Sequence, residues 1–423
     1  MALQILGKAA DFLWGTPLML FLLGTGIACT IRLGFPQRHI PKAIRQSLYS
    51  GQSDGHRPFS ALMLHLAATL GVGNITGVAA AIAVGGAGSV LWCWLSGMLG
   101  IATAYAETRS ALAFCPHTVS PMHALSAIGR HRCAALYALA LASSGLFIGA
   151  MLPSNAIVST LPTPAPLSGC ILSLLTALVI LGGVRRISRA CEQLVPAVML
   201  LFTAGCVGIL WINRSFIPEA LQNIFQSAFD LRAAAGGLLG SAAARAMRCG
   251  IARGVFSNEA GMGTSAVTIG TLRQGSAHER AMVSAAAVFW DTVVFCALTG
   301  LSFVTAAAAR PELLEITDGA ALSLQAFSSV PLGPSILRLC LIVLGFCCMI
   351  GWCFVGGRGF VYLCPKHERL YCLLWCLGIL LGAFLQEEVL WTLADLLNIC
   401  VILPSLYAIW LYLHKHSSPD SNT

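Results

Sequence analysis

Long blocks of apolar residues recur along the whole chain, and short polar or Pro- and Gly-rich segments separate them. A helix that spans a bilayer needs roughly 20 predominantly apolar residues, whereas a spanning β-strand shows a ten-residue alternation that is absent from this sequence. The blocks predict eleven membrane-spanning helices, at residues 14–33, 60–84, 88–113, 133–151, 166–184, 193–212, 236–256, 282–306, 333–356, 370–385 and 389–412.

The composition agrees with a membrane protein. Hydrophobic residues make up 57% of the chain and charged residues 10%, with a mean hydropathy of +0.80, and a water-soluble domain of this kind would aggregate. In hydrocarbon the backbone N–H and C=O groups must pair within their own segment, so we expect an all-α membrane protein. The net charge of +8 predicts attraction to anionic lipid, and without a basic stripe interleaved with aromatics we expect no nucleic-acid partner.

Basic residues indicate the orientation in the membrane, because Lys and Arg are retained in cytoplasmic loops. Most of them follow odd-numbered spans, as Arg185, Arg186 and Arg189 follow the fifth. This bias predicts an N-terminus outside, a C-terminus in the cytoplasm and residence in the bacterial inner membrane.

Two glycine-rich segments introduce polar residues at membrane depth, namely residues 69–77 and 248–263. Backbone that leaves the helical path in a bilayer persists only where it lines a wet cavity or is buried in protein. There, freed N–H groups can bind a carboxylate and freed carbonyls can bind a cation. Close helix packing through small residues is the alternative explanation of the glycines.

The polar neighbours Thr69, Asn74, Asn258 and Glu259 favour a binding site, since polar groups are costly in hydrocarbon. The two segments lie five spans apart, so their helices cross the membrane in opposite directions, as in inverted repeats. We therefore expect one transmembrane domain. Its predicted parts are the first span with its loop (1–58), a first repeat of spans two to six (59–213), a second repeat of spans seven to eleven (214–413) and a cytoplasmic tail (414–423).

The sequence resembles the alanine/glycine:cation symporter family, also called sodium:alanine symporters. The resemblance rests on residues 71–79, on residues 254–263 and on Gly351-Trp352, in an ordered series along nearly the whole chain. It implies a leucine-transporter-like 5+5 inverted repeat with a peripheral first helix. The implied substrate is alanine, glycine or D-alanine, moved with sodium or a proton and without a cofactor.

Carried onto this sequence, the resemblance places the substrate against the backbone of Gly71, Val72 and Gly73, opposite Cys348 and Trp352. The predicted substrate site is completed by four residues of the two interrupted segments, which are Thr69, Asn74, Gly250 and Gly254.

The implied cation site uses the carbonyls of Ala67 and Leu70, the amide at Asn74, and the ninth-span residues Cys347 and Cys348. Relatives carry hydroxyl side chains in that part of the ninth span. Sodium prefers oxygen ligands, and a neutral thiol is a poor substitute. Coupling to protons therefore stays open beside coupling to sodium.

Three carboxylates in or at the ends of spans, Glu107, Glu259 and Asp291, could carry a coupling proton. The alternative is that they cap helices or pair with an arginine such as Arg253. Arg245 and Arg248 precede the second interrupted segment, and we expect them to face a wet vestibule.

The remaining candidate chemistry is sparse. Most of the seventeen cysteines are scattered through apolar helices, and no Cys-x-x-Cys pair is present. His65 has no His or Cys partner at ligand spacing, so we expect packing or pore-lining functions and no metal beyond a transported sodium ion. No catalytic motif or nucleotide-binding loop is present. We expect a carrier and not an enzyme, with an amino-acid permease of wider specificity and, less favoured, a channel as alternatives.

Overall fold

The computed structural model describes residues 12–49, 57–229, 242–272 and 274–415. Within these ranges every regular element is a helix, which confirms the predicted all-α class. The longer helices are α2 (Thr16–Arg32), α3 (Ile40–Tyr49), α4 (Pro58–Thr69), α5 (Val78–Gly85), α6 (Ser89–Phe114), α8 (His131–Ser144), α9 (Leu152–Thr160), α10 (Ala165–Ile180), α11 (Gly183–Ile212), α12 (Ile217–Ala228), α13 (Ala242–Asn258), α15 (Ala277–Val288), α16 (Ala297–Ala309), α17 (Gly319–Phe327), α18 (Gly333–Leu363), α19 (Glu368–Gly382) and α20 (Glu387–Lys415).

Shorter segments connect or continue these helices. Three are wider, π-helical turns inside longer helical paths, at η2 (Gly73–Gly77), η3 (Gly145–Met151) and η6 (Phe289–Cys296). Such turns shift the helical register and are frequent at functional sites. The others are η1 (Pro36–His39), α7 (Pro121–Ala127), η4 (Arg214–Phe216), α14 (Thr264–Ile269) and η7 (Pro311–Glu315).

Each predicted apolar block coincides with helix in the described residues. In the described part of the chain, six helices, among them α6, α11 and α18, are long and apolar enough to cross a membrane, and two bent helix pairs raise the number to as many as eight. The predicted count of eleven spans therefore stays a prediction.

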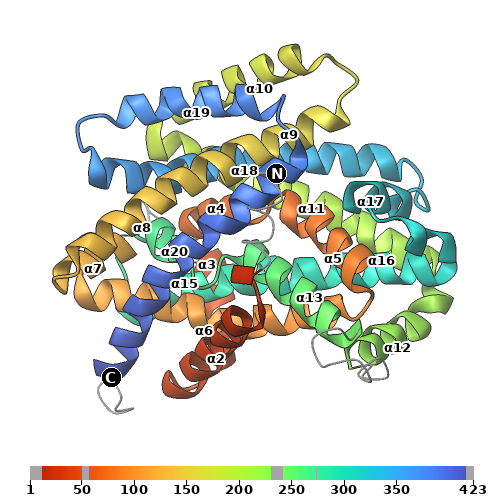
Figure 1. Cartoon of the computed structure of the whole chain (residues 1–423), viewed down its shortest axis with the longest axis horizontal. Coiled ribbons are helices and arrows are strands. Elements are labelled where there is room, and N and C mark those ends of the chain that lie inside the picture. Colours follow the sequence, from red (N-terminus) through yellow and green to blue (C-terminus); the bar gives the residue numbers. More distant parts are fainter. Residues whose placement is uncertain (1–11, 50–56, 230–241, 273, 416–423) are drawn as a thin grey trace.

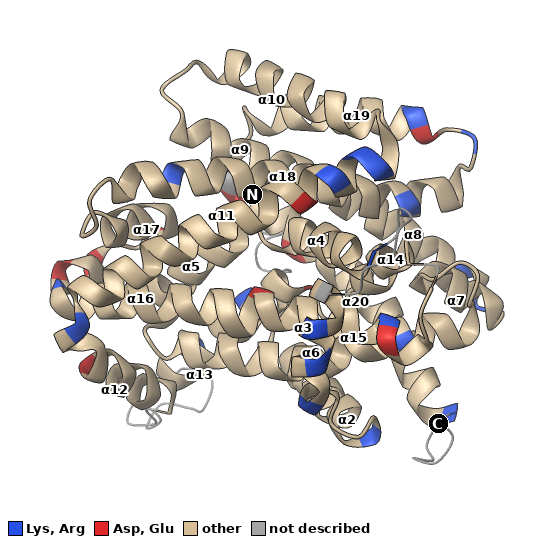
Figure 2. Ribbon diagram, turned by 180° about the vertical axis from the view of Figure 1, so that it is seen from behind, with Lys and Arg blue, Asp and Glu red and all other residues tan. Residues whose placement is uncertain are grey.

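The helices pack around α18, which contacts α4, α8, α9 and α11. Helices α10 and α19 lie side by side along one edge of the molecule, while α2 and α12 lie at the opposite edge (Figure 1). Charged residues gather at helix ends and connections, and most of the helical surface is uncharged (Figure 2). This distribution is the one a bilayer demands, because charges are costly at its centre.

The helix of the second predicted span is interrupted where its glycines begin. Helix α4 ends at Thr69, Leu70 has an extended ψ of 98°, and the following helical segment is bent by 57° from α4. The predicted interruption of this span is therefore present.

The second interruption lies later than expected. Helix α13 runs unbroken through Gly250 and Gly254 to Asn258, so the expectation of unwound backbone at these two glycines was wrong. They are packing glycines: a Cβ on Gly250 would lie 2.3 Å from the Ser89 carbonyl oxygen, and one on Gly254 would lie 1.9 Å from the Ser96 hydroxyl. The small residues let α13 approach α6 closely.

The chain leaves the helix between Glu259 and Gly263, before α14 begins. Glu259, Gly261 and Gly263 have φ values of 54°, 101° and 79°, in the left-handed region. Glycine adopts this region freely, whereas a residue with a Cβ is strained there. Glu259 is thus held in a conformation that its surroundings impose.

Candidate substrate and cation site

Asn74 connects the first interruption to two other segments. Its side-chain oxygen accepts a hydrogen bond from the Gly71 amide at 3.0 Å, so the residue holds the backbone of the interruption. Its Nδ2 donates to the Ser257 hydroxyl at 2.7 Å and to Asp291 Oδ1 at 2.8 Å. Asn74 is completely buried. One side chain therefore holds the interruption against the end of α13 and against η6.

Asp291 is the acceptor at the centre of this network. Its Oδ2 receives hydrogen bonds from the Ser257 hydroxyl at 2.7 Å and from the Thr292 hydroxyl at 2.6 Å, in addition to the Asn74 bond on Oδ1. A carboxylate has about four acceptor positions, and three of them are occupied. Asp291 thus connects the segments at the interruptions through hydrogen bonds. The network leaves its carboxylate little capacity to accept a hydrogen bond from a further ligand.

Glu107 of α6 reaches the second interruption. Its Oε1 accepts a hydrogen bond from the Gly261 amide, which satisfies a backbone donor freed when the helix ends. Its Oε2 is buried and has no hydrogen-bond partner among the described residues. Glu107 thus retains an oxygen without a hydrogen-bond partner in the described residues, at a point where the main chain is irregular.

Glu259 lies inside the second interruption itself. It is buried, its Oε2 has no hydrogen-bond partner in the described part of the chain, and its neighbours include Thr264, Trp352 and the carboxylates of Glu107 and Asp291. Glu107 and Glu259 therefore lie at the second interruption, and Asp291 is hydrogen-bonded to Asn74 of the first. A buried carboxylate without full hydrogen bonding is costly unless a proton or a cation compensates it.

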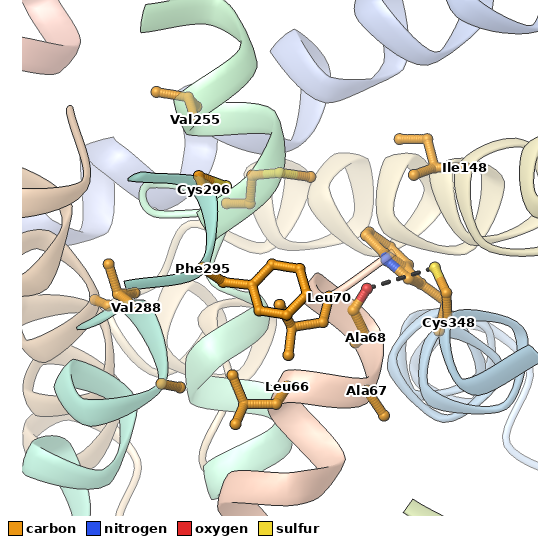
Figure 3. Packing of buried hydrophobic residues seen from close by; sticks show 14 of the residues in the cluster. Leu66, Ala67, Ala68, Leu70, Ile148, Val255, Val288, Phe295, Cys296 and Cys348 are labelled. Carbon is orange, nitrogen blue, oxygen red and sulfur yellow. Dashed lines mark hydrogen bonds between the residues drawn. The ribbon is translucent and has the colours of Figure 1, made fainter. Parts of the chain in front are cut away.

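Helix α18 closes the site from the other side. The Cys348 thiol donates to the Ala68 carbonyl at 3.5 Å, as Figure 3 shows, and its sulfur lies 3.4 Å from the position that a Cβ of Gly71 would occupy. Trp352, one turn further along, is buried beside Gly149 and near Glu259. The predicted partners Cys348 and Trp352 thus face the first and the second interruption.

Of the residues predicted to bind a cation, Ala67 lies in the last turn of α4, Leu70 directly follows it, and the Cys348 thiol donates to the Ala68 carbonyl. Ala67, Leu70 and Cys347 are completely buried, and the close approach of Gly351 to Ala67 and Ala68 brings α18 against the carbonyl end of α4. Among the described residues no group of three His, Cys, Asp or Glu side chains is arranged to bind a metal ion. The ligands on offer to a cation here are main-chain carbonyls and sulfur.

The other predicted substrate residues line the same interruption. Phe256 of α13 packs with its ring 3.0 Å from the position of a Cβ on Gly73, which explains the glycine. The Val72 carbonyl accepts a hydrogen bond from the Thr76 hydroxyl at 3.0 Å, and the Thr69 hydroxyl donates to the His65 carbonyl at 3.2 Å. The predictions for Thr69, Gly71, Val72 and Gly73 as substrate ligands stay predictions.

Several hydroxyl residues of the site were not predicted from the sequence. Ser257 and Thr292 complete the network around Asp291. The His65 ring contacts the Ser265 hydroxyl at 3.3 Å and the Thr268 hydroxyl at 3.0 Å, and so joins α4 to α14. The available signal was the presence of hydroxyl residues beside the second interruption, but only the fold shows which helix they face.

Comparison with known proteins agrees with this architecture. A family model described as "Sodium:alanine symporter family" matches residues 1–418. The sodium/alanine symporter AgcS of Methanococcus maripaludis is 34% identical over 96% of this chain and 94% of its own length. A putative sodium/proton-dependent alanine carrier protein, YrbD of Bacillus subtilis, is 30% identical over 90% of this chain and 84% of its own.

The fold is also that of a solved structure. MhsT, crystallised in complex with L-phenylalanine, superposes with a TM-score of 0.66 over 86% of this chain and 90% of its own, at 15% identity. The likeness shows the leucine-transporter fold with its two inverted repeats. The repeat boundaries at residues 59–213 and 214–413 remain as predicted from the sequence.

Proposed function

Because the chain belongs to the sodium:alanine symporter family, we propose that it is a secondary active transporter that moves alanine, glycine or D-alanine together with a cation by alternating access. The observation that carries the proposal is the Asn74 network, in which one buried side chain joins the interruption after α4 to the end of α13 and to Asp291. Irregular backbone at membrane depth is the feature that transporters of this fold use to bind substrates.

The geometry supports a division of tasks around the two interruptions. The substrate lies against residues 71–73, with Cys348 and Trp352 opposite, and the carbonyl end of α4 attracts the coupling cation because a helix C-terminus carries partial negative charge. Gly71 and Gly351 let α18 approach the end of α4 closely, and this close approach favours an amino acid with a small side chain.

Uptake by proteoliposomes tests the proposal. Purified protein is reconstituted, and accumulation of radiolabelled alanine, glycine and D-alanine is followed with an inward sodium gradient or an inward proton gradient imposed separately. We expect accumulation above the equilibrium level with one of the gradients, and none in protein-free liposomes. Absence of gradient-dependent accumulation of every small amino acid would contradict the proposal, and counterflow exchange at equal concentrations separates a carrier from a channel.

Coupling to protons is the second candidate. Two observations favour it: the sulfur of Cys348 lies at the carbonyl end of α4, and Glu107 and Glu259 each have a buried oxygen without a hydrogen-bond partner in the described residues. A carboxylate of this kind can take up and release a proton as the site opens to either side. If choline replaces sodium at a fixed proton gradient, retained uptake supports proton coupling and abolished uptake supports sodium.

A further inference from the structure

A cavity of about 330 Å³ lies beside the N-terminal part of α13, between α13, α5 and α20. Three arginines of α13, Arg245, Arg248 and Arg253, line it together with Asp395 of α20. Their spacing places them along one side of the helix, and Arg245 and Arg248 are exposed. The structure thus agrees with the expectation that these two arginines face a vestibule.

The charge on this cavity is unusual for a membrane protein surface. Three guanidinium groups and one carboxylate line it, and arginine stays protonated in proteins. Charges near membrane depth generally mark a path for ions or substrates. A concave surface of one predominant sign concentrates ligands of the opposite charge.

The cavity is separated from the first interruption by a short stack of side chains. The Arg253 guanidinium lies 4.4 Å from the centroid of the Trp391 ring, and the centroids of the Trp391 and Phe256 rings are 4.9 Å apart. The Phe256 ring in turn packs against Gly73. A ligand in the cavity is therefore one layer of side chains away from the proposed substrate site.

We propose that this cavity is an entry site that binds the carboxylate of the incoming amino acid through Arg245 and Arg248. The proposal rests on the proposed function. Guanidinium groups bind carboxylates with two parallel hydrogen bonds, and Asp395 adds one negative charge to the same lining. The volume is within the range of small-molecule pockets. In the predicted topology α13 begins at the outer face, so the cavity receives substrate from outside.

The first test compares transport by Arg245→Gln, Arg248→Gln and the double variant with the wild type. Arg214→Gln is the matched control, because Arg214 lies between the sixth and seventh predicted spans, on the face where α13 begins in the predicted topology, and does not line the cavity. Initial rates of alanine uptake are measured against alanine concentration at low and high ionic strength, with sodium and pH held constant and choline chloride as the added salt.

We expect the KM of the double variant to rise about tenfold with kcat within twofold of the wild type, because the charge-assisted hydrogen bonds to the substrate carboxylate are lost. The wild-type KM should rise with ionic strength, and that of the double variant should not. Arg214→Gln should behave as the wild type. A double variant with unchanged KM and unchanged salt dependence, or with a loss confined to kcat, would overturn the entry site.

A binding measurement separates this inference from the proposed function. Saturation-transfer NMR on the purified protein uses propionate, which has the carboxylate without the ammonium group, and ethylamine, which has the reverse. Propionate binding should be present in the wild type and in Arg214→Gln and lost in the double variant, which must elute as the wild type does in size-exclusion chromatography. Ethylamine binding should not depend on the two arginines.

Each combined outcome has one interpretation. If the wild type accumulates no amino acid under any gradient, yet propionate binding needs Arg245 and Arg248, the transport proposal fails and the anion site stands. If uptake is gradient-driven but propionate does not bind, or binds equally to the double variant, transport stands and the entry site is refuted.

Discussion

At the scale of single residues, Asn74 makes more of the hydrogen bonds that hold the site together than its position in the sequence indicates. It fixes the Gly71 amide, the Ser257 hydroxyl and the Asp291 carboxylate at once. If one partner of a buried hydrogen bond is removed, the remaining polar groups stay buried without a hydrogen bond, which is energetically costly. The residue should therefore be sensitive to any shortening of its side chain.

We expect Asn74→Ala to lower amino-acid uptake by about tenfold to a hundredfold, because hydrogen bonds to a charged group contribute about 1.5–3 kcal/mol. Uptake per reconstituted molecule is the measurement. Asn155→Ala is the matched control, since Asn155 also donates two hydrogen bonds, to the Gly382 and Leu385 carbonyls, but away from the interruptions. Wild-type uptake by Asn74→Ala, or equal losses in both variants, would show that the network is not specific to transport.

At the scale of helices, two kinds of glycine must be distinguished. Gly71, Gly261 and Gly263 belong to interrupted backbone, whereas Gly250 and Gly254 lie in a regular helix and only permit its contact with α6. The sequence shows both kinds in similar polar surroundings. Packing decides between them, because the neighbouring helix supplies the surface that a Cβ would meet.

Gly250→Ala should destabilise the folded protein by about 1–3 kcal/mol, the usual cost of inserting a methyl group into a filled contact. Gly24→Ala in α2 is the control, because among the described residues no heavy atom beyond the adjoining backbone of its own helix lies within 4 Å of a Cβ there. It should be neutral or slightly stabilising, since alanine favours helix. The midpoints of thermal unfolding in detergent give the comparison, and equal midpoints in the two variants would contradict the packing argument.

His65 links α4, which precedes the first interruption, to α14, which follows the second. We expect His65→Leu to slow transport and to be coupled to Thr268→Val by about 0.5–3 kcal/mol in a double-mutant cycle on uptake rates, because the two side chains share a hydrogen bond. His65→Gln should restore part of the rate, since an amide can both donate and accept.

Thr305→Val is the control partner for that cycle. Among the described residues, the Thr305 hydroxyl donates within its own helix alone, to the Leu301 carbonyl at 2.7 Å. Its effect should add to that of His65→Leu. Coupling energies of similar size for Thr268 and Thr305 would show that the His65 contacts do not join the two helices functionally.

At the scale of the whole molecule, the distribution of Lys and Arg predicts which face meets the cytoplasm. Cys364 follows α18 in a predicted cytoplasmic loop and is an exposed free thiol. A membrane-impermeant maleimide should therefore label it in inverted membrane vesicles and not in intact cells. Cys364→Ser identifies the labelled residue by loss of the signal, and labelling of Cys364 from outside would reverse the predicted topology.

The sequence by itself determined the helical class, because each long apolar block must satisfy its backbone hydrogen bonds locally in lipid. It also located the first interruption, because glycines permit non-helical backbone and an asparagine is costly in the middle of an apolar block. The three buried carboxylates could be singled out for the same reason, that charge is costly in hydrocarbon.

Only the tertiary structure decided how these parts meet. It moved the second interruption from Gly250 and Gly254 to Glu259–Gly263, gave Asn74 its partners, and joined His65 to hydroxyls two hundred residues away. The local sequence shows where a polar residue must be desolvated in lipid. The hydrogen-bonding group that offsets this cost comes from another helix. That partner is fixed by packing between segments distant in the chain, which no local pattern contains.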